Sequence, residues 1–248
     1  MPGCASLSPV APSLARHPAP YQGPAVSPIQ TVVLDAGHGG HDPGTSHFGL
    51  REKDLTLDIA RRLRVQLEGR GLTVTMTRDR DEFIELSRRP AIANRMGADL
   101  FVSVHVNANR NRQVSGIEVY YPRESRINAA GLLPPSVQPA EVGPATPTVR
   151  QILWDLVLSR TRRYSIRMAV HLCRAMRARL GTRCRGVKGA RFVVLREAVM
   201  PAVLIEVGYV SNHAEASRLS SPSYREAIAD GIADGLFSYV EELGLQHI

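Results

Sequence analysis

The sequence contains few cysteines and few aromatic residues, and each shortage argues against a class of protein. It has three cysteines in 248 residues and no Cys-x-x-Cys pair, so we expect neither a disulfide framework nor a thiolate zinc site. Cys173 and Cys184 flank the end of a predicted helix and could pair in an oxidising compartment, but we expect two unrelated buried thiols. Aromatic residues make up 5%, with one Trp, which argues against stacking platforms for single-stranded nucleic acid.

Long apolar runs are also missing, and none reaches the length of a membrane span. Residues 1–29 are rich in Pro, Ala and Ser and lack the continuous apolar segment of a signal peptide. We predict that they form a disordered extension or the remnant of a processed leader. A single catalytic domain is expected over residues 30–248, with a flexible, proline-rich insertion at about 123–150.

The charge balance is basic, with a formal net charge of +8. A basic chain is attracted to anionic polymers such as nucleic acid, acidic lipid or cell-wall material. The arginines are spread over predicted helix faces, which favours solvated faces over one binding groove. Because no basic-aromatic motif accompanies the charge, we expect no nucleic-acid partner.

Apolar runs alternate with segments of helical spacing along the folded part. Buried or alternating runs predict strands at 31–37, 72–78, 100–108, 116–122, 191–197 and 201–210. Apolar residues at helical spacing predict helices at 52–71, 85–98, 149–180 and 223–243. This alternation predicts an α/β domain with a mostly parallel twisted sheet and helices on both faces.

Four chemically capable residues lie at predicted strand ends or loops. His38 follows the first strand, His105 lies near the end of a buried strand, and Glu206 follows the apolar run AVLI. Because ligands bind at the carboxyl ends of parallel strands, these three are expected at one edge of the sheet. Glu52 begins the first long helix, which can bring it to the same edge.

Taken singly, most of these residues have an ordinary structural explanation. His38 would be a loop residue, His105 a core histidine, and Glu52 a carboxylate favoured by the helix dipole. Glu206 is harder to explain, because a buried carboxylate without a nearby cation is costly. His41 and His47 share the loop of His38 and stay open as alternative ligands.

Taken together, the residues predict metal-assisted hydrolysis. Two imidazoles and a carboxylate can hold a zinc ion and leave one position open for water. A further carboxylate beside that position can accept the water's proton, which is the minimum equipment for cleaving an amide.

Several segments then point to a family. They are VVLDAGHGGHDPGT, REKDLTLDIARRL, RDEFIELSRRPAIANRMGADLFVSVHVNAN, SGIEVYY, RGVKGARFVVLREAVMPAVLIEVGYVSN and the last helix. In these segments and in their order, over most of residues 31–243, the chain resembles the zinc-dependent N-acetylmuramoyl-L-alanine amidases of bacterial cell walls.

The resemblance implies a role for each residue. His38, Glu52 and His105 would be the zinc ligands and Glu206 the catalytic carboxylate, which sets His41 and His47 aside. The implied reaction is hydrolysis of the amide between N-acetylmuramic acid and L-alanine in peptidoglycan, for wall remodelling and daughter-cell separation. Such a substrate implies a periplasmic or other extracytoplasmic location, and we expect a monomer.

The resemblance also bears on the insertion. In division-associated members an inserted helix covers the zinc site until an activator protein displaces it. Because the stretch at 123–150 is short, proline-rich and poor in carboxylates, we expect weaker autoinhibition here. A variable surface loop without a regulatory role is the alternative.

Two other functions remain compatible with the sequence. A non-catalytic peptidoglycan-binding or regulatory module would keep the fold and the zinc, although the intact Glu206 argues against it. A general zinc peptidase is permitted as well, because the ligand set alone does not select the amide bond.

Overall fold

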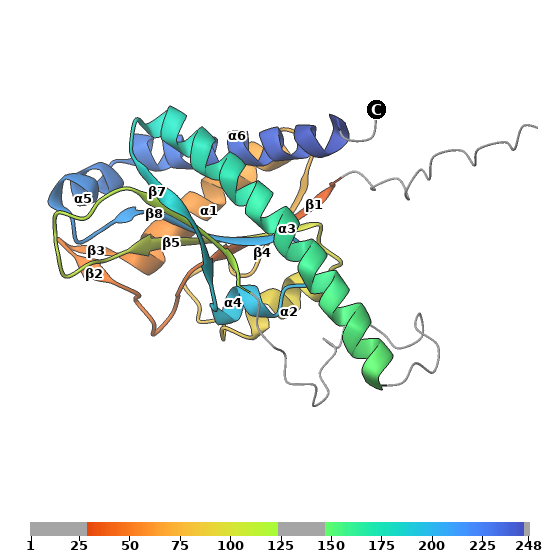
Figure 1. Cartoon of the computed structure of the whole chain (residues 1–248). Helices are drawn as coiled ribbons and strands as arrows, with labels where there is room; N and C mark the ends of the chain where they lie inside the picture. The colour runs from red at the N-terminus through yellow and green to blue at the C-terminus, as the bar shows by residue number, and fades with distance from the viewer. Residues whose placement is uncertain (1–28, 124–146, 246–248) are drawn as a thin grey trace, which may run out of the picture.

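A six-stranded sheet in the order β4-β1-β5-β8-β6-β7 forms the centre of the computed structural model (Figure 1). The structure describes residues 29–123 and 147–245. The strands are β1 (Thr31–Ala36), β4 (Thr73–Met76), β5 (Leu100–Asn107), β6 (Ile117–Pro122), β7 (Cys184–Ala190) and β8 (Ala202–Tyr209), while β2 (Ser46–His47) and β3 (Leu50–Arg51) form a separate small hairpin. Strand β6 is antiparallel to β8, and every other neighbouring pair in the main sheet is parallel.

Helices cover both faces of this sheet. The helices are α1 (Glu52–Glu68), α2 (Arg88–Arg95), α3 (Pro147–Leu180), α4 (Val193–Arg196), α5 (His213–Ser220) and α6 (Pro222–Leu245). Helices α1, α3 and α6 pack together over one face, whereas α2 and α4 pack on the other. The prediction of an α/β domain with a mostly parallel sheet and helices on both faces is therefore confirmed.

The alternation of side chains along the strands builds two cores. On β1, Val32 and Leu34 join the large core beneath α1, α3 and α6, whereas Val33 joins the smaller core with α2 and α4. All three side chains are fully buried. Apolar residues at consecutive positions are what a strand covered on both faces requires.

The prediction of a strand at 191–197 is wrong. Residues Val193–Arg196 form the single turn of helix α4, in which the backbone N–H groups of Leu195 and Arg196 both donate to the carbonyl of Phe192. A short apolar run has no periodicity that separates a buried strand from a buried helical turn. The strand at this edge of the sheet is β7, which precedes the predicted segment.

The expectation of two unrelated thiols is also wrong, because Cys173 and Cys184 form a disulfide. Cys173 lies in α3 and Cys184 is the first residue of β7, and their Cα atoms are 5.8 Å apart. The close packing of α3 against β7 brings the cysteines together. The bond ties the edge strand to the longest helix.

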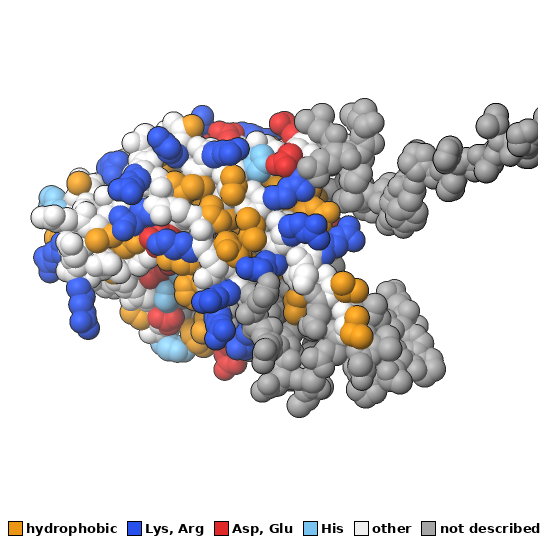
Figure 2. Space-filling view, viewed as in Figure 1, with side chains coloured by type: hydrophobic (Ala, Val, Ile, Leu, Met, Phe, Trp, Pro, Cys, Tyr) orange, Lys and Arg blue, Asp and Glu red, His pale blue; other side chains and the backbone are white. Residues whose placement is uncertain are grey.

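Two other expectations concern parts of the chain that the structure leaves largely undescribed. The predicted N-terminal extension at 1–29 lies outside the described residues except for Ile29, and so does most of the insertion at 123–150. Within residues 29–123 and 147–245, no helix combines the length and apolar character that a bilayer crossing needs. Basic side chains are spread over the face formed by α3 and α6 rather than gathered in one groove (Figure 2).

Candidate metal centre

The loop after β1 delivers His38 to the edge of the sheet. His38 has a left-handed backbone, with φ of 60°. The preceding Gly37 packs so closely beneath the ring of His105 that an added Cβ atom would lie 2.4 Å from it. At Gly44 an added Cβ would lie 2.5 Å from Oε2 of Glu52. The absence of side chains at these two glycines therefore lets the loop close around the three polar residues.

His38, Glu52 and His105 form one group. The ligand atoms that they offer all lie within 4.8 Å of one another, and the side chain of Glu52 sits between the two rings. Its Oε2 lies 3.1 Å from Nε2 of His38, and its Oε1 lies 2.9 Å from Nδ1 of His105. The three come from the β1 loop, the first residue of α1 and strand β5, as the sequence predicted.

Further contacts fix the orientation of these side chains. Asp42 Oδ2 lies 2.7 Å from Nδ1 of His38, which leaves Nε2 facing Glu52. The backbone N–H groups of Thr45 and Val106 donate to the two oxygens of Glu52, at 2.9 and 3.0 Å. Carboxylate contacts of this kind orient the imidazole ligands of metal sites.

Two buried arginines hold the loop from behind. Arg78 and Arg89 are each 1% exposed. Arg78 donates to the carbonyls of Ala36 and Gly37, and Arg89 donates to those of Ala36 and His38. In the sequence neither arginine is distinguished from the many surface arginines.

Asp35 balances the charge of Arg89 in the interior. Its Oδ1 lies 3.0 Å from Nη1 of Arg89, and it accepts hydrogen bonds from Thr77 and Ser103 at 2.7 Å each. A buried ion pair with its remaining lone pairs satisfied is rigid, and losing one partner leaves an uncompensated charge. The loop of His38 therefore rests on a fixed base.

The electrostatics of the group favour an ionised carboxylate. Burial opposes ionisation of Glu52, but hydrogen bonds from His105 and His38 outweigh it and hold the pKa of Glu52 far below its ordinary value. Burial likewise opposes the charged form of His38, yet Glu52 and Asp42 together raise the pKa of His38 above its usual 6.5. The negative charges of Glu52 and Asp42, which favour the protonated form of His38, would also favour a metal cation at this place.

Glu206 lies next to this group on β8, where it is the register partner of His105 on β5. Its Oε2 is enclosed and has no hydrogen-bond partner among the residues that the structure describes. Burial, with the negative charges of Glu52 and Glu118, raises the pKa of Glu206 well above its ordinary value. An orphaned carboxylate oxygen beside three convergent donors fits a site that receives a cation and a polar substrate.

The two alternative histidines lie elsewhere. The ring of His41 packs against Phe83, with the centroids 4.2 Å apart, and the ring of His47 lies 6.2 Å from that of Phe48. Among residues 29–123 and 147–245, the group that can hold a metal contains neither.

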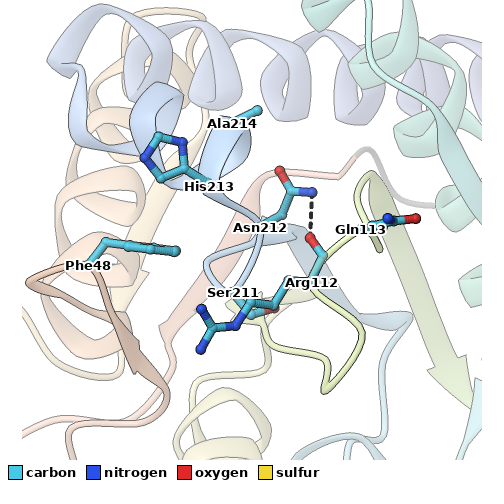
Figure 3. Close-up of a pocket in the computed structure, with 7 residues that line it drawn as sticks. All are labelled: Phe48, Arg112, Gln113, Ser211, Asn212, His213 and Ala214. Atoms are coloured by element: carbon cyan, nitrogen blue, oxygen red, sulfur yellow. Dashed lines mark hydrogen bonds between the residues drawn. The ribbon is translucent and has the colours of Figure 1, made fainter.

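A shallow hollow lies at the same edge of the sheet (Figure 3). Its lining consists of Phe48, Arg112, Gln113, Ser211, Asn212, His213 and Ala214, which follow β5 and β8 or belong to the hairpin before Glu52. The rings of Phe48 and His213 meet edge to face, 5.2 Å apart, and the amide of Asn212 donates to the carbonyl of Arg112. The hollow thus combines an exposed aromatic ring with amide and guanidinium groups.

Comparison with known proteins decides the family. Residues 32–238 match the family described as N-acetylmuramoyl-L-alanine amidase. The chain belongs to this family.

Individual relatives agree with this assignment. The chain is 33% identical over 210 residues to the amidase LytC of Bacillus subtilis, covering 85% of this chain and 35% of LytC. It is 33% identical over 219 residues to AmiA of Escherichia coli, with coverages of 85% and 76%. To AmiC of Neisseria meningitidis it is 36% identical over 237 residues, with coverages of 92% and 57%. The chain thus spans about a third of LytC and just over half of this AmiC.

Solved structures show the same fold. The amidase AmiC2 of Nostoc punctiforme matches with a TM-score of 0.68 and 32% identity, covering 86% of this chain and 97% of AmiC2. The amidase CwlD of Clostridioides difficile, solved in complex with the lipoprotein GerS, matches with a TM-score of 0.69 and 26% identity, covering 86% and 99%.

Proposed function

We propose that this protein hydrolyses the amide between N-acetylmuramic acid and L-alanine in peptidoglycan, with zinc as its cofactor. The observation that carries the proposal is the buried Oε2 of Glu206, which has no hydrogen-bond partner among the described residues and lies beside the group formed by His38, Glu52 and His105. Family membership supports the choice of bond, which the donor set alone does not select.

The residues fit zinc. Two imidazoles and one carboxylate are a common protein ligand set of catalytic zinc, and they leave a further position open. A zinc ion held by His38, Glu52 and His105 would supply Lewis acidity, lowering the pKa of water and polarising the scissile carbonyl. The negative field of Glu52 and Asp42 around His38 supports a cation at this place.

Glu206 is assigned the role of general base in this proposal. In this proposal its carboxylate orients the attacking water, accepts a proton from it and passes that proton to the departing amine of L-alanine. The backbone N–H groups of Thr45 and Val106, together with Asp42, hold the ligands in place during this exchange. Enclosure of Glu206 excludes bulk water from one side of the reacting groups.

The hollow lined by Phe48 supports binding of a polymer. Its exposed aromatic ring and the amides of Asn212 and Gln113 suit the apolar face and the acetamido groups of an amino sugar. We place part of the glycan strand there, adjacent to the strands that carry His105 and Glu206.

An extracytoplasmic location follows from this substrate, because peptidoglycan lies outside the cytoplasmic membrane. The disulfide between Cys173 and Cys184 supports it, since disulfides persist in oxidising compartments. Within that compartment we propose a role in wall remodelling and separation of daughter cells. Loss of the protein in its source bacterium would then leave chains of undivided cells.

We also propose that a partner protein regulates the activity. One related amidase has been solved in complex with a lipoprotein, which supports a protein partner here, and we propose that this partner is an activator. The expectation of weak autoinhibition by the insertion at 123–150 remains a prediction. Deleting residues 125–147 should change activity little, whereas a many-fold rise would contradict weak autoinhibition.

Digestion of purified peptidoglycan by the zinc-loaded protein, with mass spectrometry of the products, tests the proposal. Free stem peptides that begin with L-alanine, together with glycan strands stripped of peptide, are the expected products. Cleavage within the peptide instead would indicate a general zinc peptidase. Binding without release, by protein that holds one zinc ion, would favour a non-catalytic wall-binding module.

A further inference from the structure

A row of ionisable side chains crosses four strands of the sheet. His105 on β5 is the register partner of Glu206 on β8, and Glu206 is in turn the partner of Glu118 on β6. Direct partners on adjacent strands project to the same face. Beyond Glu118, the row ends on β7 with Arg185 and Lys188, which both form ion pairs with Glu118.

Glu118 is buried and fully occupied. It accepts from Nζ of Lys188 at 2.6 Å, from Nε of Arg185 at 3.2 Å and from the hydroxyl of Tyr120 at 2.6 Å. The side chain of Glu118 is 4% exposed, whereas those of Lys188 and Arg185 are 44% and 33% exposed. Two cations thus converge on one carboxylate while both keep part of their surface in solvent.

Two cations, Arg185 and Lys188, pair with the single carboxylate of Glu118. An ammonium has three N–H donors and a guanidinium has five, and a single carboxylate cannot use all of them. Glu118 thus carries one negative charge against the two positive charges of Arg185 and Lys188, whose side chains both reach solvent. Arg185 is further steadied by the ring of Tyr209, 5.9 Å from its Cζ atom, and by its neighbour Cys184, which the disulfide anchors.

We propose that Arg185 and Lys188 form a subsite for a carboxylate of the stem peptide, next to Glu206. The inference rests on the proposed function, because it takes the bound peptide to begin at the amide beside Glu206. Arginine and lysine are the side chains that bind carboxylates through charge-assisted hydrogen bonds. The ion pairs with Glu118 hold the side chains of Arg185 and Lys188 in position.

The spacing matches the second residue of the peptide. Strands β8 and β7 are separated by two strand spacings, about 10 Å. Two residues of extended chain reach about 7 Å. A carboxylate that branches from the second residue extends this reach by a few ångströms. The second residue of peptidoglycan stems is a glutamate with a free α-carboxylate in some walls and an amide in others, so this subsite would distinguish the two wall types.

The test compares muramyl tripeptides of sequence L-Ala-γ-D-Glu-L-Lys, with glutamate or with isoglutamine at the second position, as substrates of the zinc-loaded full chain. We expect wild-type kcat/KM to be about tenfold to 100-fold higher for the free carboxylate, mainly through KM. In the double variant Arg185→Gln, Lys188→Gln this ratio should fall to about 1. The control is Arg95→Gln, at an exposed arginine in the last turn of α2, before the amino end of β5, and it should keep the wild-type ratio.

Equal rates on both tripeptides by the wild type would overturn the subsite. A double variant that loses activity on both substrates by the same factor would also overturn it, because the cations would then only neutralise Glu118. A third tripeptide, amidated at its C-terminus alone, separates the second-residue carboxylate from the terminal one.

Failure of the proposed function gives a different result, namely no cleavage of any tripeptide. Binding of the same three compounds to the Glu206→Gln variant, measured by calorimetry, then decides the subsite without turnover. Tighter binding of the free carboxylate, lost with Arg185 and Lys188, supports it, and equal affinities contradict it.

Discussion

Glu118 and Glu206 are direct partners across the antiparallel strands β6 and β8, yet their surroundings are opposite. Glu118 is held by Lys188, Arg185 and the hydroxyl of Tyr120, whereas Oε2 of Glu206 has no partner among the described residues. Burial opposes ionisation of both, but Lys188 and the hydroxyl of Tyr120 bring the pKa of Glu118 below its ordinary value, while the pKa of Glu206 rises. One carboxylate is thereby fixed, and its neighbour is left available for chemistry.

Replacing Glu206 with glutamine should abolish hydrolysis without removing the metal. Loss of the group that accepts the proton is expected to lower kcat by about 10²–10⁴-fold on peptidoglycan. Elemental analysis should still find one zinc ion per chain, because Glu206 is not one of the three grouped ligands. His38→Ala is the matched comparison and should lose the metal itself. Full activity of Glu206→Gln would contradict the assignment.

Replacing Arg89 with methionine should destabilise the protein and loosen the His38 loop. The change leaves the carboxylate of Asp35 buried without its cation, which typically costs about 3–5 kcal/mol of unfolding free energy. Urea denaturation measures this loss, and a zinc titration of the folded fraction should show weaker binding. The neighbouring Arg88 is exposed, so Arg88→Met serves as the control and should change neither quantity.

Reduction of the disulfide should lower stability without unfolding the domain. Cys173 and Cys184 are 11 residues apart, and closing a loop of this size stabilises by about 2–3 kcal/mol in the chain-entropy model. Thermal unfolding with and without a reductant measures the difference. The double variant Cys173→Ser, Cys184→Ser should match the reduced protein and be insensitive to reductant; sensitivity in that variant would place the effect elsewhere.

The ion pairs of Glu118 predict a specific loss of stability in acid. Because the folded-state pKa of Glu118 lies below its ordinary 4.5, ionisation of Glu118 stabilises the fold above about pH 4.5. That stabilisation is lost as the pH falls through the folded-state pKa. Urea denaturation between pH 7 and pH 3 should therefore show a shallower decline in Glu118→Gln than in wild type. Glu68→Gln, at an exposed position, should follow the wild-type curve.

Removing the ring of Phe48 should weaken binding of polymeric substrate. Phe48 is 51% exposed at the tip of the β2–β3 hairpin, so Phe48→Ala is expected to leave the core and the zinc content unchanged. We expect KM on sacculi to rise several-fold, with a smaller effect on short muramyl peptides. Met96, which is 46% exposed at the end of α2, supplies the control Met96→Ala. An equal effect on polymer and short peptide would argue against glycan binding in the hollow.

Much of this protein is determined by the sequence alone, since the relevant signals are local. The largely apolar runs of β1, β5 and β8 indicate strands buried on both faces, and helical spacing after Glu52 indicates α1. Parallel strands then place His38, His105 and Glu206 at one edge, because their carboxyl ends meet there. The charge of Glu206 in an apolar run was itself a signal, since burying a carboxylate requires a reason.

Only the tertiary structure decided the rest, because it depends on contacts between distant segments. Arg78 and Arg89 resemble surface arginines in the sequence, and their role at the His38 loop appears only when they fold against β1. The pairing of Cys173 with Cys184 required the packing of α3 on β7, and the single turn of α4 could not be told from a strand. The cations around Glu118 belong to a strand separated from it by about 70 residues. Pairwise contacts over such separations carry no local pattern, so the fold alone assembles them.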